Sequence, residues 1–167
     1  GDNLKAKDCY EKAIEINPNY SNAHNNLGIV FKASRERSKA INCYEKAIET
    51  NPYNIDAHVN LGVAFYELGN LQKAKSCYEK AIEINPNLPN AYNNLGNIFQ
   101  NLGEYQKAVK YYEKAIEINP NLPNALNNLG VLFFELGDNL KAKDCYEKAL
   151  KIEPDNIGIL TNYSTNL

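Results

Sequence analysis

The chain repeats itself every 34 residues, and this periodicity limits its possible folds more than any other feature of the sequence. The recurring columns include those of Leu27-Gly28, Phe31, Ala40, Tyr44, Ala47 and Pro52, whose members are 34 residues apart. Residues 1–13 are repeated letter for letter at 137–149. A period of this length is typical of an array of small units that bury their apolar faces against one another.

Each period contains two apolar patterns with helical spacing. In the third full period the first pattern comprises Ala91, Leu95, Phe99 and Leu102, separated by 4, 4 and 3 residues. The second comprises Ala108, Tyr112, Ala115 and Ile116. Residues spaced in this way share one face of an α-helix. The period is therefore predicted to be two helices joined by a turn.

Glycine and proline mark the ends of these helices. Gly69, Gly103 and Gly137 directly follow the first pattern, where a left-handed residue commonly ends a helix. A proline follows the second pattern in every period. It is expected to end the helix there, because it has no N–H to donate and restricts the conformation of the residue before it. Pro89 and Pro123 fall where the next first helix begins, which proline tolerates.

A further glycine recurs in the middle of each first helix. Gly28 and its equivalents Gly62, Gly96 and Gly130 cost about 0.5–1 kcal/mol each relative to alanine. Their recurrence predicts that another helix approaches closely at this point. The alanines of the second helix would permit that approach, and the Phe31 and Tyr44 columns would fill the remaining space.

The ordered pattern of Leu-Gly, aromatic, Gly, Ala, aromatic, Ala and Pro resembles the tetratricopeptide repeat. The resemblance extends over essentially the whole chain and implies an all-α fold, a right-handed α-solenoid of about ten helices. Four full repeats are expected at 21–54, 55–88, 89–122 and 123–156. Residues 1–20 resemble the second helix of an earlier repeat, and 157–167 the first helix of a later one.

One residue departs from the repeat pattern in a turn. Arg35 replaces the turn glycine of the first full repeat, within the polar segment 34–38. The sequence predicts an altered or looser turn at this position.

Composition excludes several functional classes. The net charge of −2 lacks the basic character that phosphate contacts require, so nucleic acid is not expected as a partner. No apolar run is long enough to span a membrane, and no signal peptide is visible. The absence of methionine suggests a piece of a longer protein. Free thiols and the missing export signal together favour a cytoplasmic location.

No constellation for catalysis or metal binding emerges from the sequence. Cys9, Cys43, Cys77 and Cys145 share one column, with expected separations beyond disulfide reach, and are interpreted as small buried or half-buried residues. His24 and His58 share another column, without a third ligand, and are expected to pack or to line a groove. We therefore predict no enzyme, no metal and no cofactor.

Asparagine recurs on the first helices. In this family those helices line the concave side of the superhelix, so the resemblance implies a peptide-binding groove there. The residues assigned to this groove are Asn26, Asn60, Asn94 and Asn128, together with Asn25, Asn93, Asn127, Asn97 and Tyr66. The asparagine column is similar to the asparagine ladders in the tetratricopeptide superhelix of O-linked N-acetylglucosamine transferase.

Asparagine is a mediocre helix former, so its recurrence within helices requires a cause. A carboxamide offers donors and an acceptor that match an extended peptide backbone. Two alternatives stay open: the chain holds 27 asparagines, so composition contributes, and the amides could instead bond helix to helix. Only Lys32 is basic near these columns, which disfavours an acidic C-terminal tail as the ligand.

Three functions are compatible with these patterns. The first is a protein–protein interaction scaffold that binds an extended peptide in an asparagine-lined groove. The second is a substrate-recruiting arm of a larger enzyme such as a glycosyltransferase. The third is self-assembly by end-to-end stacking, since both ends of the chain would expose helix faces.

Overall fold

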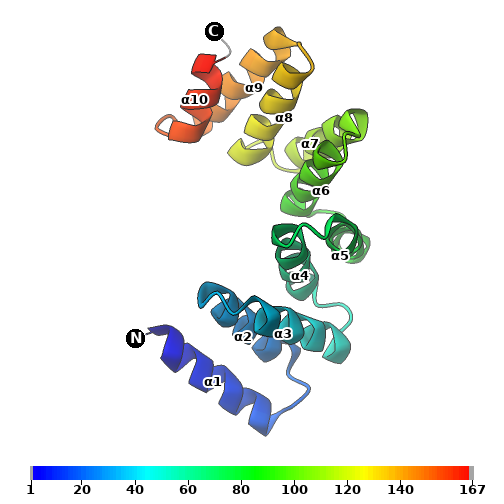
Figure 1. Ribbon diagram of the computed structural model, residues 1–167, viewed down its shortest axis with the longest axis vertical. Helices are drawn as coiled ribbons and strands as arrows, with labels where there is room; N and C mark the ends of the chain where they lie inside the picture. Colours follow the sequence, from blue (N-terminus) through cyan, green and yellow to red (C-terminus); the bar gives the residue numbers. More distant parts are fainter. Residues whose placement is uncertain (1, 166–167) are drawn as a thin grey trace. The chain divides into compact units, whose positions relative to one another are not determined.

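A computed structural model describes residues 2–165 of the protein (Figure 1). These residues form ten α-helices and contain no β-strand, which confirms the predicted all-α repeat fold. The helices are α1 (Asp2–Ile16), α2 (Ser21–Ala33), α3 (Arg37–Thr50), α4 (Ile55–Glu67), α5 (Leu71–Ile84), α6 (Pro89–Asn101), α7 (Tyr105–Ile118), α8 (Pro123–Glu135), α9 (Asn139–Ile152) and α10 (Ile157–Thr165).

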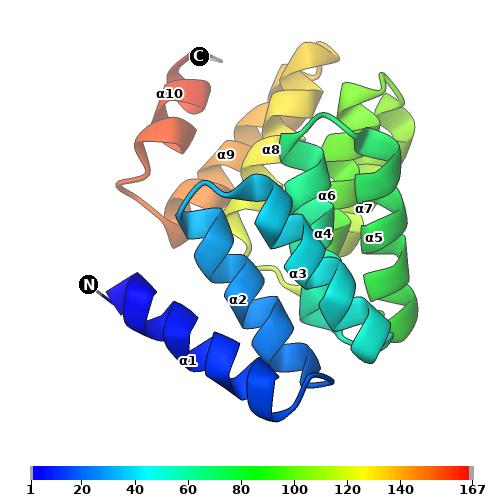
Figure 2. The ribbon, with the colours of Figure 1, turned by 60° about the horizontal axis from the view of Figure 1, so that its bottom comes forward.

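The chain divides into two compact units. Unit 1 contains α1–α5 and ends at Pro86, and unit 2 contains α6–α10. Within unit 1, α2 packs against α3 and α4 against α5, while α1 lies beside α2 and α3 beside α4 (Figure 2). Within unit 2, α6 packs against α7, α8 against α9, and α10 lies beside α9. Each unit is thus built from helical hairpins.

The helix ends follow the sequence signals. Pro89 and Pro123 are the first residues of α6 and α8. Asn54 caps α4, because its side-chain oxygen accepts the backbone N–H of Ala57 at 3.0 Å. Gly69, Gly103 and Gly137 have φ of 73°, 74° and 81°, the left-handed conformation expected after a first helix.

The prediction of a looser turn at Arg35 is wrong. Arg35 has φ of 62°, so it adopts the conformation of the glycines that it replaces. The N–H of Glu36 bonds to the carbonyl of Phe31 at 2.9 Å, as the N–H of Asn70 does to that of Phe65. The packed helices on both sides dictate the turn, and the arginine backbone bears the strain.

The cores of both units are built on contacts between a tyrosine and a glycine. Tyr44, Tyr78, Tyr112 and Tyr146 are all buried, with at most 1% of their surface exposed. A Cβ placed on Gly28 would lie 2.5 Å from the ring of Tyr44, and one on Gly62 would lie 2.7 Å from that of Tyr78. The mid-helix glycine is therefore required by the ring of the paired helix, which confirms the predicted close approach.

Candidate peptide-binding site

The predicted site residues all lie on the first helices of the hairpins. Asn25, Asn26, Asn60 and Tyr66 belong to α2 and α4 of unit 1. Asn93, Asn94, Asn97, Asn127 and Asn128 belong to α6 and α8 of unit 2. We call these two sets the unit 1 amide face and the unit 2 amide face.

Not all of these side chains are accessible to a ligand. Asn25 and Asn93 are only 5% and 9% exposed, because they lie against the next first helix of the same unit. The other seven predicted residues are half-buried. Asn25 and Asn93 therefore support their neighbours rather than present their own amides.

The unit 2 amide face contains a connected hydrogen-bond network. Asn128 of α8 donates both of its side-chain N–H groups to α6, one to Oδ1 of Asn93 at 3.1 Å and one to Oδ1 of Asn97 at 3.0 Å. The hydroxyl of Tyr112, from the second helix α7, lies 2.7 Å from the same Asn97 oxygen and 2.8 Å from Oε1 of Gln100. These bonds fix the orientation of the Asn97 and Asn128 amides.

The network decides which polar atoms of the unit 2 amide face are left for a ligand. A carboxamide has two N–H donors and one oxygen acceptor. Asn128 uses both donors inside the protein, so its oxygen is the atom left over. Asn97 uses its oxygen and retains its two N–H groups. Asn94 makes no side-chain hydrogen bond with any residue that the structure describes, so both sides of its amide are left over.

The unit 1 amide face is less connected. Asn60 of α4 donates to Oδ1 of Asn25 at 2.9 Å, and Asn25 donates to Oδ1 of Asn26 at 3.3 Å. The positions equivalent to Asn97 are Ile29 and Val63, which offer no hydrogen bond. One donor and the oxygen of Asn60 are therefore left for a ligand, beside apolar neighbours.

The regular spacing of these bonds was not predicted from the sequence. Asn60 bonds to Asn25, Asn128 to Asn93, and Asn162 of α10 to Asn127 at 2.9 Å. In each case the partners are 35 residues apart, one more than the repeat period. The sequence did contain a signal for these bonds. An asparagine in one repeat is followed by another asparagine 35 residues later in the next repeat. Part of the asparagine column thus bonds one helix to another, which the sequence had left open as an alternative to contact with a peptide.

Charge on these surfaces is neutralised locally. Lys32 of α2 forms an ion pair with Glu67 of α4 at 2.8 Å. In unit 2 the equivalent position holds Gln100, which donates to Glu135 at 3.0 Å. Lys32 is therefore paired with a carboxylate, which adds to the argument against an acidic tail.

The histidines serve in packing. Both are buried, and Nε2 of His24 lies 2.8 Å from the carbonyl oxygen of Pro18, while that of His58 lies 2.9 Å from that of Pro52. The N–H of each ring donates to the carbonyl. Among the described residues no group of three or more His, Cys, Asp or Glu side chains is arranged to hold a metal ion.

The cysteines are free thiols that differ in exposure. Cys145 is buried, Cys43 and Cys77 are half-buried, and Cys9 is exposed, so the interpretation as a buried or half-buried residue is wrong for Cys9. Burial raises the pKa of Cys43, Cys77 and Cys145 to about 11. These three thiols are therefore neutral near pH 7.

The repeated hairpins define a helical repeat protein, and comparison with known families identifies the repeat. The tetratricopeptide repeat profile matches residues 89–122 and 123–156, and a second profile of the same repeat matches 1–34, 37–69 and 62–103. A Sel1 repeat profile also matches 21–50. The chain belongs to the tetratricopeptide repeat family, whose members act as protein–protein interaction scaffolds.

Solved structures show the same fold. MamA is 28% identical, with a TM-score of 0.81, covering 92% of this chain and 90% of its own. YrrB, described as a TPR protein with an unusual peptide-binding site, is 25% identical with a TM-score of 0.78, covering 99% and 84%. TTC0263 of Thermus thermophilus is 22% identical with a TM-score of 0.78, and the match covers 96% of this chain and 88% of TTC0263. At this identity the similarity supports the fold alone. Comparison with curated proteins gives no match.

Within residues 2–165, none of the helices combines the length and the apolar character needed to cross a membrane.

Proposed function

We propose that this protein is a scaffold that binds an extended segment of another protein through the amide faces of its first helices. The observation that carries the proposal is the division of donors and acceptors on the unit 2 amide face. Asn128 presents an oxygen, and Asn97 beside it presents two N–H groups. An extended backbone has N–H and C=O groups to match both.

Two further features support this function. The amides contact backbone rather than side chains in such a complex, so the ligand needs no particular sequence at these positions. The network through Asn93 and Tyr112 holds Asn97 and Asn128 in place before a ligand arrives, which reduces the entropy lost on binding. YrrB, with its described peptide-binding site, is a precedent in a protein of similar fold.

The proposal is tested with synthetic ten-residue peptides in extended, proline-free sequences of varied side chains. Nitrogen-15 labelled protein reports binding through the side-chain NH₂ resonances of Asn94 and Asn97. We expect these resonances to shift with several unrelated peptides. The shifts should be smaller with peptides of the same sequences whose backbone nitrogens are methylated, because methylation removes the N–H groups that bond to the oxygens of Asn94 and Asn128 and so weakens binding.

Asn94→Ala is the sharpest variant, because the Asn94 amide makes no hydrogen bond within the described chain and its loss leaves the fold intact. We expect peptide affinity to fall about fivefold, the equivalent of about 1 kcal/mol. Asn42→Ala, on the exposed surface of α3, is the matched control and leaves affinity unchanged. Equal binding of methylated and unmethylated peptides would refute the backbone-recognition mechanism.

Self-association by end-to-end stacking finds no support in the hairpin geometry. In the four Gly–Tyr hairpins the first helix supplies a glycine to the tyrosine ring. The position equivalent to Gly130 in α10 is Ser164. A Tyr10 ring from a second molecule, packed in the same register, would meet the Cβ of that serine. We therefore propose the peptide-binding scaffold alone.

A further inference from the structure

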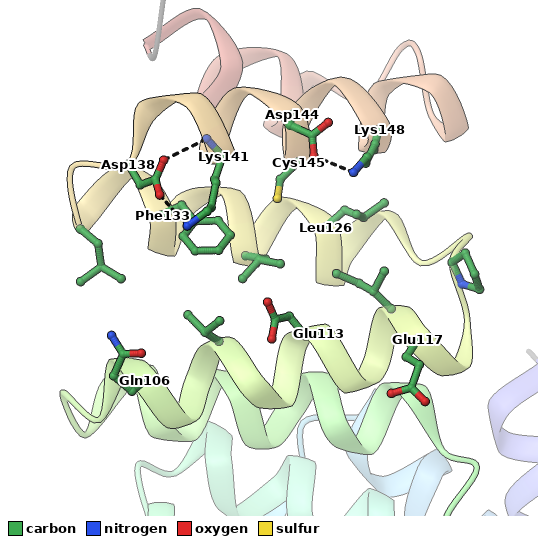
Figure 3. A pocket seen from close by; sticks show the side chains of 15 residues that line it. Gln106, Glu113, Glu117, Leu126, Phe133, Asp138, Lys141, Asp144, Cys145 and Lys148 are labelled. Atoms are coloured by element: carbon green, nitrogen blue, oxygen red, sulfur yellow. Dashed lines mark hydrogen bonds and ion pairs between the residues drawn. The ribbon is translucent and has the colours of Figure 1, made fainter.

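Unit 2 also has a concave surface whose lining includes none of the amide-face residues. A pocket of about 860 Å³ opens between the two second helices α7 and α9, with α8 as its floor (Figure 3). Its apolar lining comes from Val109 and Ile116 of α7 and from Leu126, Leu129 and Phe133 of α8. We call it the α7–α9 pocket.

No aromatic ring stacks on the Phe133 ring of the pocket among the described residues, in contrast to its equivalent in the preceding repeat. In the α6–α7 hairpin, Tyr111 stacks on Phe99 with ring centroids 5.0 Å apart and an interplanar angle of 10°. In the α8–α9 hairpin, the residue equivalent to Tyr111 is Cys145. Phe99 is 4% exposed, whereas its equivalent Phe133 is only half-buried. Phe133 is thus partly exposed, with Nζ of Lys141 5.2 Å from its ring centroid.

Around the α7–α9 pocket, one carboxylate forms no ion pair with the described residues. The lysines of α9 are already paired, Lys141 with Asp138 at 2.8 Å and Lys148 with Asp144 at 2.6 Å. Glu113 of α7 points into the pocket and forms neither a hydrogen bond nor an ion pair with the residues that the structure describes (Figure 3). The pocket thus combines an apolar floor with a single available negative charge.

The geometry of the lining selects a helix as the occupant. The pocket walls are helices whose own backbone groups are satisfied, so an extended peptide pressed onto this floor would bury N–H and C=O groups without partners. A helix satisfies its own backbone. The pocket extends along α7 from Gln106 to Glu117, about 17 Å, which accommodates about three turns of a second helix.

We propose that the α7–α9 pocket binds an amphipathic helix of a partner protein through apolar side chains at i, i+3 or i+4, and i+7. A lysine or arginine of that helix, beside the apolar row, pairs with the carboxylate of Glu113. The apolar side chains lie on Phe133 and Leu129, in the place that the ring of Tyr111 takes over Phe99. This site is separate from the amide face, so either proposal can fail without the other.

The probe is a fluorescein-labelled, end-capped 18-residue helical peptide with leucines at that spacing and one lysine beside them. Three matched peptides accompany it: one with glutamate at the lysine position, one with glutamine, and one with the same composition in scrambled order. Fluorescence anisotropy with the full chain measures each affinity. We expect the lysine peptide to bind best and the glutamate peptide to bind at least about tenfold more weakly.

Cys145→Tyr fills the pocket in the manner of Tyr111 and is expected to weaken the lysine peptide at least about tenfold, with helicity unchanged. Glu113→Gln changes an exposed side chain and leaves the pocket open. It is expected to bring the affinities of the lysine and glutamine peptides within about twofold of each other. Because this variant does not alter the core, it tests the proposal even where Cys145→Tyr fails to fold.

Three outcomes would overturn the proposal: no measurable binding of the lysine peptide, equal binding of the scrambled peptide, or an unchanged preference for lysine in Glu113→Gln. The extended peptides of the first proposal, with and without methylated nitrogens, are measured in the same variants. Cys145→Tyr should not change their binding at the amide face, so failure of the pocket proposal can be told apart from failure of the amide-face proposal.

Discussion

Tyr44 in unit 1 and Tyr112 in unit 2 occupy the same position of the repeat and have different polar surroundings. Both rings are fully buried against a glycine of the paired helix. The hydroxyl of Tyr112 bonds to Asn97 and Gln100. The hydroxyl of Tyr44 has no partner among the described residues, because Ile29 and Lys32 stand at the equivalent positions and Lys32 is paired with Glu67.

This difference shows that the apolar and polar parts of a repeat are specified separately. The contact between ring and glycine is the same in both units. Whether the hydroxyl also organises the amide face depends on two positions, which hold Asn97 and Gln100 in α6 and Ile29 and Lys32 in α2. Burial raises the pKa of Tyr44 to about 12, so its hydroxyl stays protonated and its donor is unused.

The largest effect is expected from adding a methyl group at the shared contact. Gly28→Ala and Gly96→Ala should each lower the free energy of unfolding by about 1–3 kcal/mol, because the new Cβ collides with the ring of Tyr44 or Tyr112. Chemical denaturation followed by circular dichroism measures the change. Gly158→Ala is the control, because the nearest atom to its new Cβ would be a side-chain oxygen at 3.3 Å. Unequal losses in the two units would show that the contact is not equivalent in them.

A second comparison between the units concerns Cys9 and Cys145, which lie in identical 13-residue segments. Cys9 is exposed and Cys145 is 6% exposed. At pH 8 we expect iodoacetamide to modify Cys9 at least about tenfold faster, measured by mass spectrometry of peptides, since a thiol that is buried and neutral does not react. Equal rates would show that α9 opens readily.

The same thiol gives a dependence on pH. Burial raises the pKa of Cys145 from 9.0 to about 11, so the folded state favours the protonated form. This contribution to stability is fully present below about pH 9 and is lost as the pH rises from 9 to 11. The loss should be smaller in Cys145→Ala, when unfolding is measured at about pH 8 and about pH 10.5.

The tyrosine hydroxyls provide the next smaller effect. Tyr112→Phe should cost about 0.5–1.5 kcal/mol, because it removes a bond to Asn97 and Gln100. Tyr44→Phe should be neutral or stabilising, because it removes a buried hydroxyl that has no partner among the described residues. Thermal and urea unfolding of the two variants test this difference directly, and a comparable loss in both would contradict it.

The smallest effect is expected from transferring the polar arrangement between the units. Ile29→Asn places an amide beside the hydroxyl of Tyr44 and should add about 0.5–1 kcal/mol to the free energy of unfolding. The gain should vanish in the Tyr44→Phe background, so a double-mutant cycle gives the coupling energy. Additivity of the two changes would mean that the new amide does not reach the hydroxyl.

Several elements of the fold could be predicted from local sequence. The helix starts at Pro89 and Pro123 and the left-handed turns at Gly69, Gly103 and Gly137 depend on intrinsic backbone preferences. Arg35 shows the limit of this reasoning. Its side chain indicated an altered turn, yet the helices on either side impose the same left-handed conformation.

The candidate site was predicted less completely. The asparagine columns assigned the candidate site to the first helices, and periodicity did not show that Asn25 and Asn93 are buried and bond to the next helix. Burial of a polar residue depends on how far neighbouring helices turn relative to each other, which periodicity does not specify. The α7–α9 pocket was also missed, because Cys145 is the common residue of its column and gave no signal of a pocket.

The amino-acid sequence alone determined the repeated helical hairpin and its close Gly–Tyr contact, because spacing and side-chain size are local properties that recur in every period. Tertiary packing decided which amide atoms remain available and where a pocket forms between the second helices of unit 2. Both depend on the distance and rotation between helices about 35 residues apart, where a difference of a few ångströms separates a formed hydrogen bond from an open one.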